Sequence, residues 1–286
     1  MALLNEVKKL LKERFEKKTK WAAREENVKD EFYTKEPADN LFTKKIPDHL
    51  NKREERRIGA IHSSAALTFN IFGEENKTVR YNKKNYSLEY EAELETLIGT
   101  SKAKLDAKIE TKGEIIFFEV KMTEWFSASK IKVAEAYKEI KKYGLDKNES
   151  TEFIKLFRAI DKKGEKPIVY DMYQMAKHLL GIYKFAREEE NQGKRIRLIN
   201  CVWEVEDPGL LPDREKKRYE KLEMQMEDEY KEFIKIATPI IDLIKKKTNF
   251  KLEKLTFKTI YNQIIPINEA QKKRLEMYRI KNQAVL

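Results

Sequence analysis

LDAKIETKGEIIFFEVK, residues 105–121, is the stretch of the chain that decides the fold. Its first part alternates apolar and polar residues, and its last part, 115–121, is apolar on both faces until it reaches a Glu and a Lys. Alternation with period two is typical of a strand with one buried face, whereas a short apolar run is typical of a central strand. The Thr-Lys-Gly turn at 111–113 joins the two runs. The sequence therefore predicts a β-hairpin.

Further strands and helices are predicted on both sides of this hairpin. Strict alternation predicts a strand at 86–94, and KRIRLINCVWEV predicts another at 194–205. Apolar residues at helical spacing predict helices, which cover residues 1–20, 51–72, 127–143, 149–160, 168–190, 213–247 and 266–283, with a short strand near 255–261. This order indicates an α/β (α+β) protein with an αβββαβ core, a mixed central sheet flanked by helices, and helical additions at both ends.

Three parts of the chain follow from this order. We expect an N-terminal helix and arm at 1–50, a core with a helical insertion at 51–206, and a C-terminal helical extension packed on the core at 207–286. The long helices 1–20 and 213–247 are candidates for a homodimer interface or an arm that clasps DNA. The alternative is that both pack onto the core of their own chain.

The composition favours a polyanionic partner. The 286 residues include 60 Lys and Arg against 49 Asp and Glu, which gives a net charge of +11. Such an excess favours nucleic acid, although a Lys-rich soluble surface would give the same count. The single cysteine, Cys201, excludes an intramolecular disulfide framework and a Cys-based zinc site. The chain shows no secretory signal and no apolar run of ~20 residues, so we expect a cytoplasmic protein with no membrane partner.

The hairpin carries a candidate site at Glu119-Val120-Lys121. Triplets of this kind are frequent in so charged a chain, but this one ends an apolar strand. Period-two geometry puts Glu119 and Lys121 on one face, and Asp106 on the adjacent strand could lie beside Glu119. Two close carboxylates repel, and a divalent cation relieves the repulsion. Lys121 would then meet a water or a phosphate; the alternative is a salt bridge in which Lys121 only neutralises Glu119.

The same stretch resembles the active-site hairpin of the PD-(D/E)xK, or restriction-endonuclease-like, nuclease superfamily. Asp106, Glu119 and Lys121 match the Asp, Glu and Lys of that motif. HSSAALTFNIFG (62–73) and EVKMTEWF (119–126) are similar to segments of a bacterial branch of restriction-endonuclease-like proteins. The resemblance covers roughly residues 50–205 and departs at Leu105, where the motif has a Pro that many members lack.

The resemblance implies a metal-dependent DNA endonuclease that hydrolyses phosphodiester bonds. Asp106, Glu119 and the backbone carbonyl of Val120 would bind Mg²⁺ or Mn²⁺, and Lys121 would complete the catalytic set. The family commonly adds a Glu from the first core helix, for which Glu54 and Glu55 are candidates.

Four more residues are weighed against ordinary structural roles. Glu93, which leaves the first strand, is the rival to the helix acids, and a solvated surface acid is the alternative for all three. Glu124 directly follows the triplet and is a candidate accessory acid. Some exonuclease-like members carry a Gln-x-x-x-Tyr helix near the metals, which makes Gln174 a candidate; His178, one turn on, is expected only to pack.

The leading alternative function is a non-catalytic nucleic-acid-binding protein that retains the nuclease fold. A binder that needs no metal would not need paired carboxylates, so Asp106 with Glu119 argues against it. The chain has no Walker A loop, which excludes an ATP-driven motor of that class. DNA versus RNA, endo versus exo action and the recognition sequence stay open.

Overall fold

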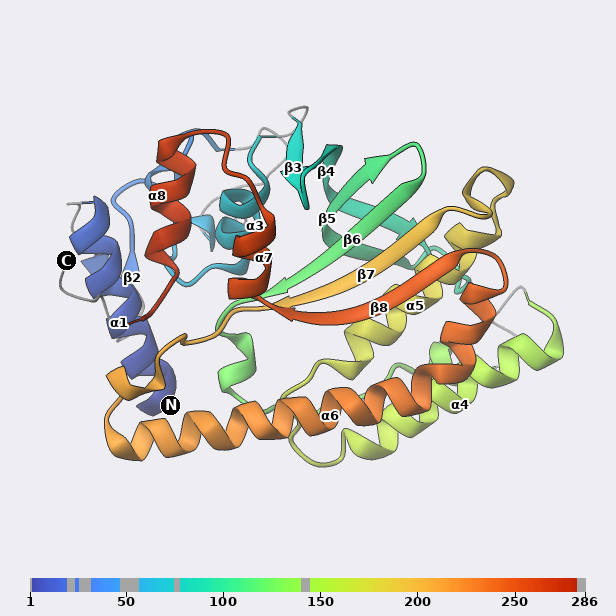
Figure 1. The fold of residues 1–286 in the computed structure, drawn as a ribbon. Helices are drawn as coiled ribbons and strands as arrows, with labels where there is room; N and C mark the ends of the chain where they lie inside the picture. The colour runs from blue at the N-terminus through green and yellow to red at the C-terminus, as the bar shows by residue number, and fades with distance from the viewer. Residues whose placement is uncertain are drawn as a thin grey trace.

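The computed structural model describes residues 2–19, 24–25, 32–46, 57–74, 78–139 and 145–281, and a six-stranded sheet forms its centre (Figure 1). Pairing is antiparallel from β3 to β6 and parallel from β6 to β8, so the sheet is mixed. In spatial order the strands are β3 (Val79–Tyr81), β4 (Lys84–Glu95), β5 (Lys102–Thr111), β6 (Glu114–Lys121), β7 (Arg195–Val202) and β8 (Asn249–Thr256).

Helices cover both faces of this sheet (Figure 1). One layer contains α3 (Ser64–Phe72), α7 (Phe257–Gln263) and α8 (Glu269–Met277). The other contains α4 (Lys147–Lys163), α5 (Met172–Arg187) and α6 (Asp213–Lys245). The order α3–β4–β5–β6–α5–β7 is the predicted αβββαβ core, so the predicted fold class is confirmed.

The predicted hairpin is present as β5 and β6. Lys112 and Gly113 form the turn, and β6 is buried from Glu114 to Val120, as expected of a central strand. Phe118 packs on Phe72 of α3 with ring centroids 4.6 Å apart, whereas Phe117 packs on Phe185 of α5 at 5.6 Å. Since alternate side chains point to opposite faces, the odd-numbered residues of β6, Glu119 among them, face α5.

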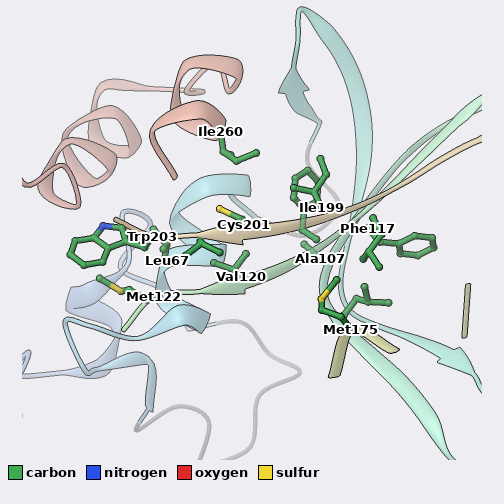
Figure 2. Close-up of a cluster of buried hydrophobic side chains, with 14 of the residues drawn as sticks. Leu67, Ala107, Phe117, Val120, Met122, Met175, Ile199, Cys201, Trp203 and Ile260 are labelled. Carbon is green, nitrogen blue, oxygen red and sulfur yellow. The ribbon is translucent and has the colours of Figure 1, made fainter. Parts of the chain in front are cut away.

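The core on the other face forms around the two central parallel strands. Val120 of β6 and Cys201 of β7 are register partners, and both are buried. Figure 2 shows them side by side with Leu67 of α3 and close to Ile260 of α7. Each fully buried aliphatic side chain of this kind contributes about 1.5–3 kcal/mol to folding. This packing fixes the ends of β6 and β7, where the candidate site lies.

The long terminal helices pack their apolar faces against other elements of the same chain. The predicted helix 1–20 is α1 (Ala2–Thr19), and Leu3, Val7, Leu11 and Phe15 on it are buried. It packs against α8 and α6. This is the packing alternative considered for these helices, and it leaves the homodimer as a prediction.

A single helix over 51–72 was the wrong expectation. Within the described residues, α3 begins only at Ser64, with the Ser63 hydroxyl accepting the N–H of Ala66 as its cap. The backbone before it is bound elsewhere: Thr34 N–H donates to Gly59 O and Ile61 N–H donates to Phe32 O. Backbone groups bonded to the N-terminal arm cannot also form a helical ladder.

The expected helix over 127–143 is also wrong in the part that the structure describes. Ser129 forms a two-way backbone bridge with Ile168, and Ile131 N–H donates to Gly164 O. A Cβ on Gly164 would lie 2.2 Å from Ile131 O, so this close approach requires glycine. Residues 127–134 therefore run extended along α4, and a 3₁₀ turn follows at Glu135–Lys138.

The C-terminal part differs from the prediction in two elements. The strand expected near 255–261 lies earlier, as β8, and residues from Phe257 form α7 instead. Thr256 caps α7 by accepting the N–H of Thr259, and this cap stops the strand. The helix expected over 266–283 is the shorter α8. None of the helices in the described ranges is long and apolar enough to cross a membrane.

Candidate functional site

The candidate site lies where the β5–β6 ladder ends. The last register pair is Ala107 with Phe118, so the next residues along, Asp106 and Glu119, follow on adjacent strands. In place of the next ladder bond, the Asp106 Oδ2 atom accepts the backbone N–H of Val120 at 2.6 Å. This bond holds the Asp106 carboxylate at the end of the hairpin, as the sequence predicts.

Glu119 is the centre of a buried polar network. Only 2% of the residue is exposed. Its Oε1 atom lies 2.8 Å from Lys121 Nζ and accepts the Gln174 amide at 2.7 Å. Its Oε2 atom lies 3.0 Å from His178 Nε2. Lys121 Nζ also donates to Gln174 Oε1 at 2.6 Å, so the three side chains form a closed ring.

Helix α5 supplies two members of this network. The Asp171 side chain accepts the N–H of Gln174 and so begins the helix. Gln174 and His178 are four residues apart and therefore share one face. Gln174, predicted as an accessory residue, touches both Glu119 and Lys121. His178 is buried as expected. Its contact with Glu119 was not predicted, although its spacing of four residues from Gln174 indicated that the two side chains share one helix face.

Asn200 was not predicted at all. It is the register partner of Glu119 on β7, and its Nδ2 atom donates to the Glu119 carbonyl at 3.3 Å. The residue is 3% exposed. A lone amide inside the apolar run LINCVW was the available signal, because a buried strand rarely carries a polar side chain without a partner.

The charges in the site oppose one another. Burial, followed by the neighbouring Glu119 charge, raises the pKa of Asp106 well above its usual value. Burial alone would raise the pKa of Glu119, but His178 and Lys121 beside it lower that pKa instead. Burial disfavours the charge on Lys121, yet the Glu119 carboxylate outweighs it and raises the Lys121 pKa. The Asp106 carboxylate therefore lacks the compensating charge that Glu119 has.

A third acid lies opposite Asp106, and it is not the expected one. Glu93 forms ion pairs with Lys102 and Lys104 on the exposed side of β4 and β5. Glu91 of β4 lies opposite Asp106 of β5, because the residues on either side of each are register partners. The charge of Glu91 contributes to the raised pKa of Asp106. Its φ of 49° is unusual for a non-glycine residue inside a strand. No sequence pattern indicated this backbone conformation.

Three predicted acids remain, which are Glu124, Glu54 and Glu55. The Glu124 Oε2 atom accepts the N–H of Met122 at 2.7 Å, and its charge acts on Lys121. Glu124 is exposed and bridges the turn after β6. Glu54 and Glu55 lie outside the described residues. The helix that follows them, α3, packs on the face opposite Glu119.

The donor set suits a hard divalent cation. In the ranges that the structure describes, no group of three or more His, Cys, Asp or Glu side chains is arranged to hold a metal. Asp106 and Glu119 nevertheless offer carboxylate oxygens, and Mg²⁺ is commonly held by one or two carboxylates with waters and substrate phosphate. Burial, and after it the Glu119 charge, disfavours the Asp106 carboxylate and raises its pKa, and a bound cation would stabilise that carboxylate. The two acids fit such an ion.

Comparison with known protein families assigns the chain to one of them. A family model described as "Restriction Endonuclease associating with ARP" matches residues 8–241, which is most of the chain. Searches of the curated proteins and of the solved structures found no match. The matched range includes α3, the β5–β6 hairpin, α5 and β7, which together build the site. The chain belongs to the family of restriction endonucleases associating with ARP.

Proposed function

We propose that this protein is a Mg²⁺-dependent or Mn²⁺-dependent endonuclease that hydrolyses phosphodiester bonds in DNA. The observation that carries the proposal is the pair of carboxylates at the end of one hairpin, Asp106 and Glu119, with Lys121 in contact with Glu119. Membership of a restriction-endonuclease family supports the reaction class.

Asp106, Glu119 and the Val120 carbonyl would hold the metal ion. When bound, the ion lowers the pKa of a water and stabilises charge on the phosphate. The chain's own residues position these ligands. The Val120 N–H fixes one oxygen of Asp106, while Gln174 and His178 each bind one oxygen of Glu119. Such supporting contacts commonly change metal affinity or activity by 10–100-fold when removed.

Lys121 acts in this proposal as a fixed positive charge. Its raised pKa keeps the ammonium charged at neutral pH, which suits stabilisation of charge on the phosphate better than proton abstraction. Gln174 holds the ammonium in place from the other side. The same contacts would exist if Lys121 only neutralised Glu119, so its role requires a kinetic test.

The net charge of +11 supports a nucleic-acid substrate. The candidate site itself is acidic, so the basic excess lies elsewhere on the chain, where it can contact phosphates. The family description also names an association with ARP, and an association of this chain with ARP is part of the same proposal. A binder that retains the fold without catalysis would have no use for two acids, Asp106 and Glu119, side by side at the end of the hairpin.

The test is direct. Supercoiled plasmid, linear duplex, single-stranded DNA and RNA are incubated with the protein in Mg²⁺ or Mn²⁺, with EDTA as the control. We expect metal-dependent cleavage of DNA, and sequencing of the new ends gives the site preference. Binding to DNA with no cleavage under any metal would favour the non-catalytic alternative and contradict the proposal.

A further inference from the structure

An extended segment, residues 127–134, follows the turn after β6 and runs beside the candidate site. Its odd-numbered residues are bonded to the connection between α4 and α5. Ser129 exchanges two backbone bonds with Ile168, and Ile131 N–H donates to Gly164 O. In an extended chain, successive residues direct their N–H and C=O groups to opposite edges. One backbone edge of the segment is therefore held by the protein, and the other is directed away from that connection.

The outer edge carries two lysines without a partner. Lys130 and Lys132 are both exposed, and within the described ranges neither forms an ion pair and neither backbone N–H bonds to a protein group. The charge of Lys132 acts on Asp161, but that carboxylate pairs with Lys138 at 2.8 Å and accepts the N–H of Val133. Lysine ammonium groups and backbone N–H groups both commonly bind phosphate oxygens of nucleic acids.

The other face of the same segment borders the candidate site. Ser127, Ser129 and Ile131 line a cavity of about 230 Å³, together with Lys121 and Gln174 of the network around Glu119. The residues between them, the two lysines included, do not line this cavity. Ser127 and Ser129 are exposed, so this part of the segment lies at the mouth of the cavity. The lysines therefore lie within one residue of the site's border, on its solvent side.

The charges around the cavity differ from those on the segment. Two acids, Glu124 and Asp171, line the cavity, and its one ammonium, Lys121, is already paired with Glu119 at 2.8 Å. The segment SASKIKVA at 127–134 contains two lysines and no acid. Acids at the site repel the phosphates of an approaching strand, so the strand requires cations beside the site. The segment supplies two such cations.

We propose that residues 127–134 form a phosphate-binding rim, in which Lys130 and Lys132 bind the DNA backbone beside the phosphate that is cleaved. The inference rests on the proposed nuclease function, which assigns the cleaved phosphate to Lys121. Contacts to phosphates position a strand and carry no sequence information. The rim therefore holds the flanking backbone in place and leaves any recognition of bases to other parts of the chain.

The double variant Lys130→Gln/Lys132→Gln tests the rim. Both side chains are exposed and unpaired, so the variant should melt at the wild-type temperature. Binding of labelled duplexes is measured by fluorescence anisotropy in Ca²⁺, which replaces Mg²⁺ so that the DNA stays intact, at salt concentrations from ~50 to ~200 mM. Two lost phosphate contacts should make the slope of log affinity against log salt less steep by about 1.8. Over this range the wild-type affinity should fall roughly tenfold further than that of the variant.

Lys83→Gln/Lys112→Gln is the matched control. These lysines are also exposed and form no ion pair within the described residues, but they lie in the β3–β4 and β5–β6 turns, at the end of the strands away from Asp106. The control loses the same two charges, and it should keep the wild-type slope. The loss in the rim variant should be equal for duplexes of different sequence, because phosphate contacts do not read bases.

The outcomes separate the two proposals. A wild-type salt slope in Lys130→Gln/Lys132→Gln would overturn the rim and leave the nuclease proposal standing. An equal loss in both double variants would also overturn it, since the effect would then follow the net charge alone, and so would a loss that depends on the duplex sequence. No binding of the wild-type protein to any duplex or to its single strands would instead contradict the proposed function.

Discussion

Lys121 is the residue at which two interpretations of the site differ most. If it only neutralises Glu119, Lys121→Ala leaves a buried carboxylate without its cation and destabilises the protein by several kcal/mol. If it stabilises charge on the phosphate, the variant stays folded in Mg²⁺, because the metal still neutralises the acids. Single-turnover cleavage then falls by ~10²-fold or more. Melting temperature and cleavage rate, both measured in Mg²⁺, distinguish the two.

Lys108→Ala is the matched control for this variant. Lys108 lies on the neighbouring strand, is 19% exposed against 22% for Lys121, and also pairs with a glutamate, Glu89. We expect Lys108→Ala to cut at close to the wild-type rate. A Lys121→Ala protein that is folded, binds Mg²⁺ and cuts normally would remove Lys121 from the mechanism.

Glu204 should make stability depend on pH. Burial raises its pKa to about 7 from an ordinary value of 4.5, even though the N–H groups of Phe257 and Lys258 bond to it. Between these two values the folded chain binds more protons than the unfolded chain, so the stability from this group is present below pH 4.5 and is lost as pH rises through 7. The loss is on the order of 3 kcal/mol, because the two pKa values differ by about 2.5 and each pH unit between them contributes about 1.4 kcal/mol.

Glu204→Gln removes the ionisation and therefore this part of the pH dependence. Urea unfolding at pH 5 and at pH 8 measures it for both proteins. We expect the fall in stability between the two pH values to be smaller in the variant. An identical fall in variant and wild type would mean that Glu204 keeps an ordinary pKa.

The sequence predicted those site residues that share one local motif. Asp106, Glu119 and Lys121 lie on one hairpin, so alternation alone could place them near each other. Asn200 and His178 reach the site through the β6–β7 pairing and the packing of α5 on the sheet, so their local signals alone could not show which residue they contact. Gln174, on the same helix as His178, was predicted only from the family resemblance.

Strand β4 contains a residue in a strained conformation. Glu91 has a φ of 49° opposite Asp106, although L-residues in this region cost about 1–2 kcal/mol. Glu91→Gly should therefore stabilise the protein by up to about 1 kcal/mol. Glu93→Gly, two residues on with an ordinary backbone, should destabilise it by about 0.5–1 kcal/mol. Chemical denaturation of both variants gives the comparison, and destabilisation by both would show that the strain at Glu91 is absent.

The elements that were predicted correctly show a clear alternation or helical spacing of apolar residues. Within the described residues, no distant segment competes for their backbone hydrogen bonds. Strands β4 to β7 and helices α1, α4, α5 and α6 fall in this group. The errors at 51–72 and 127–143 share one cause. Both segments have helical spacing, but their backbone N–H and C=O groups bond to distant segments, 32–34 in one case and 161–168 in the other. Local propensity is a weak prior against such contacts.

The whole chain carries a net charge of +11, although the candidate site itself contains the acids Asp106 and Glu119. Each neutralised phosphate releases counterions, so log affinity for DNA should fall with log salt at a slope of about −0.9 per contact. Titrations of one duplex at several salt concentrations between ~50 and ~200 mM measure this slope. An affinity that hardly changes over this range would show that the charge of +11 does not serve DNA binding.

The division of the chain into three parts remains a prediction, with one structural fact added. The extension after residue 206 is not only helical, because β8 within it forms the last strand of the central sheet beside β7. Helix α6 then packs against β8, α4 and α5. These connections give the C-terminal residues a part in holding the site.

The most direct test of the central claim is single-turnover DNA cleavage by Asp106→Asn and Glu119→Gln in Mg²⁺, with DNA binding measured in parallel. Both changes keep the shape of the side chain and remove its charge. We expect cleavage to be abolished in both variants while DNA affinity is unchanged or higher, since metal ligands are a small part of the basic contact surface and each lost acid repelled phosphate. Wild-type cleavage by both variants would contradict the assignment of Asp106 and Glu119 as the metal-binding acids of a nuclease.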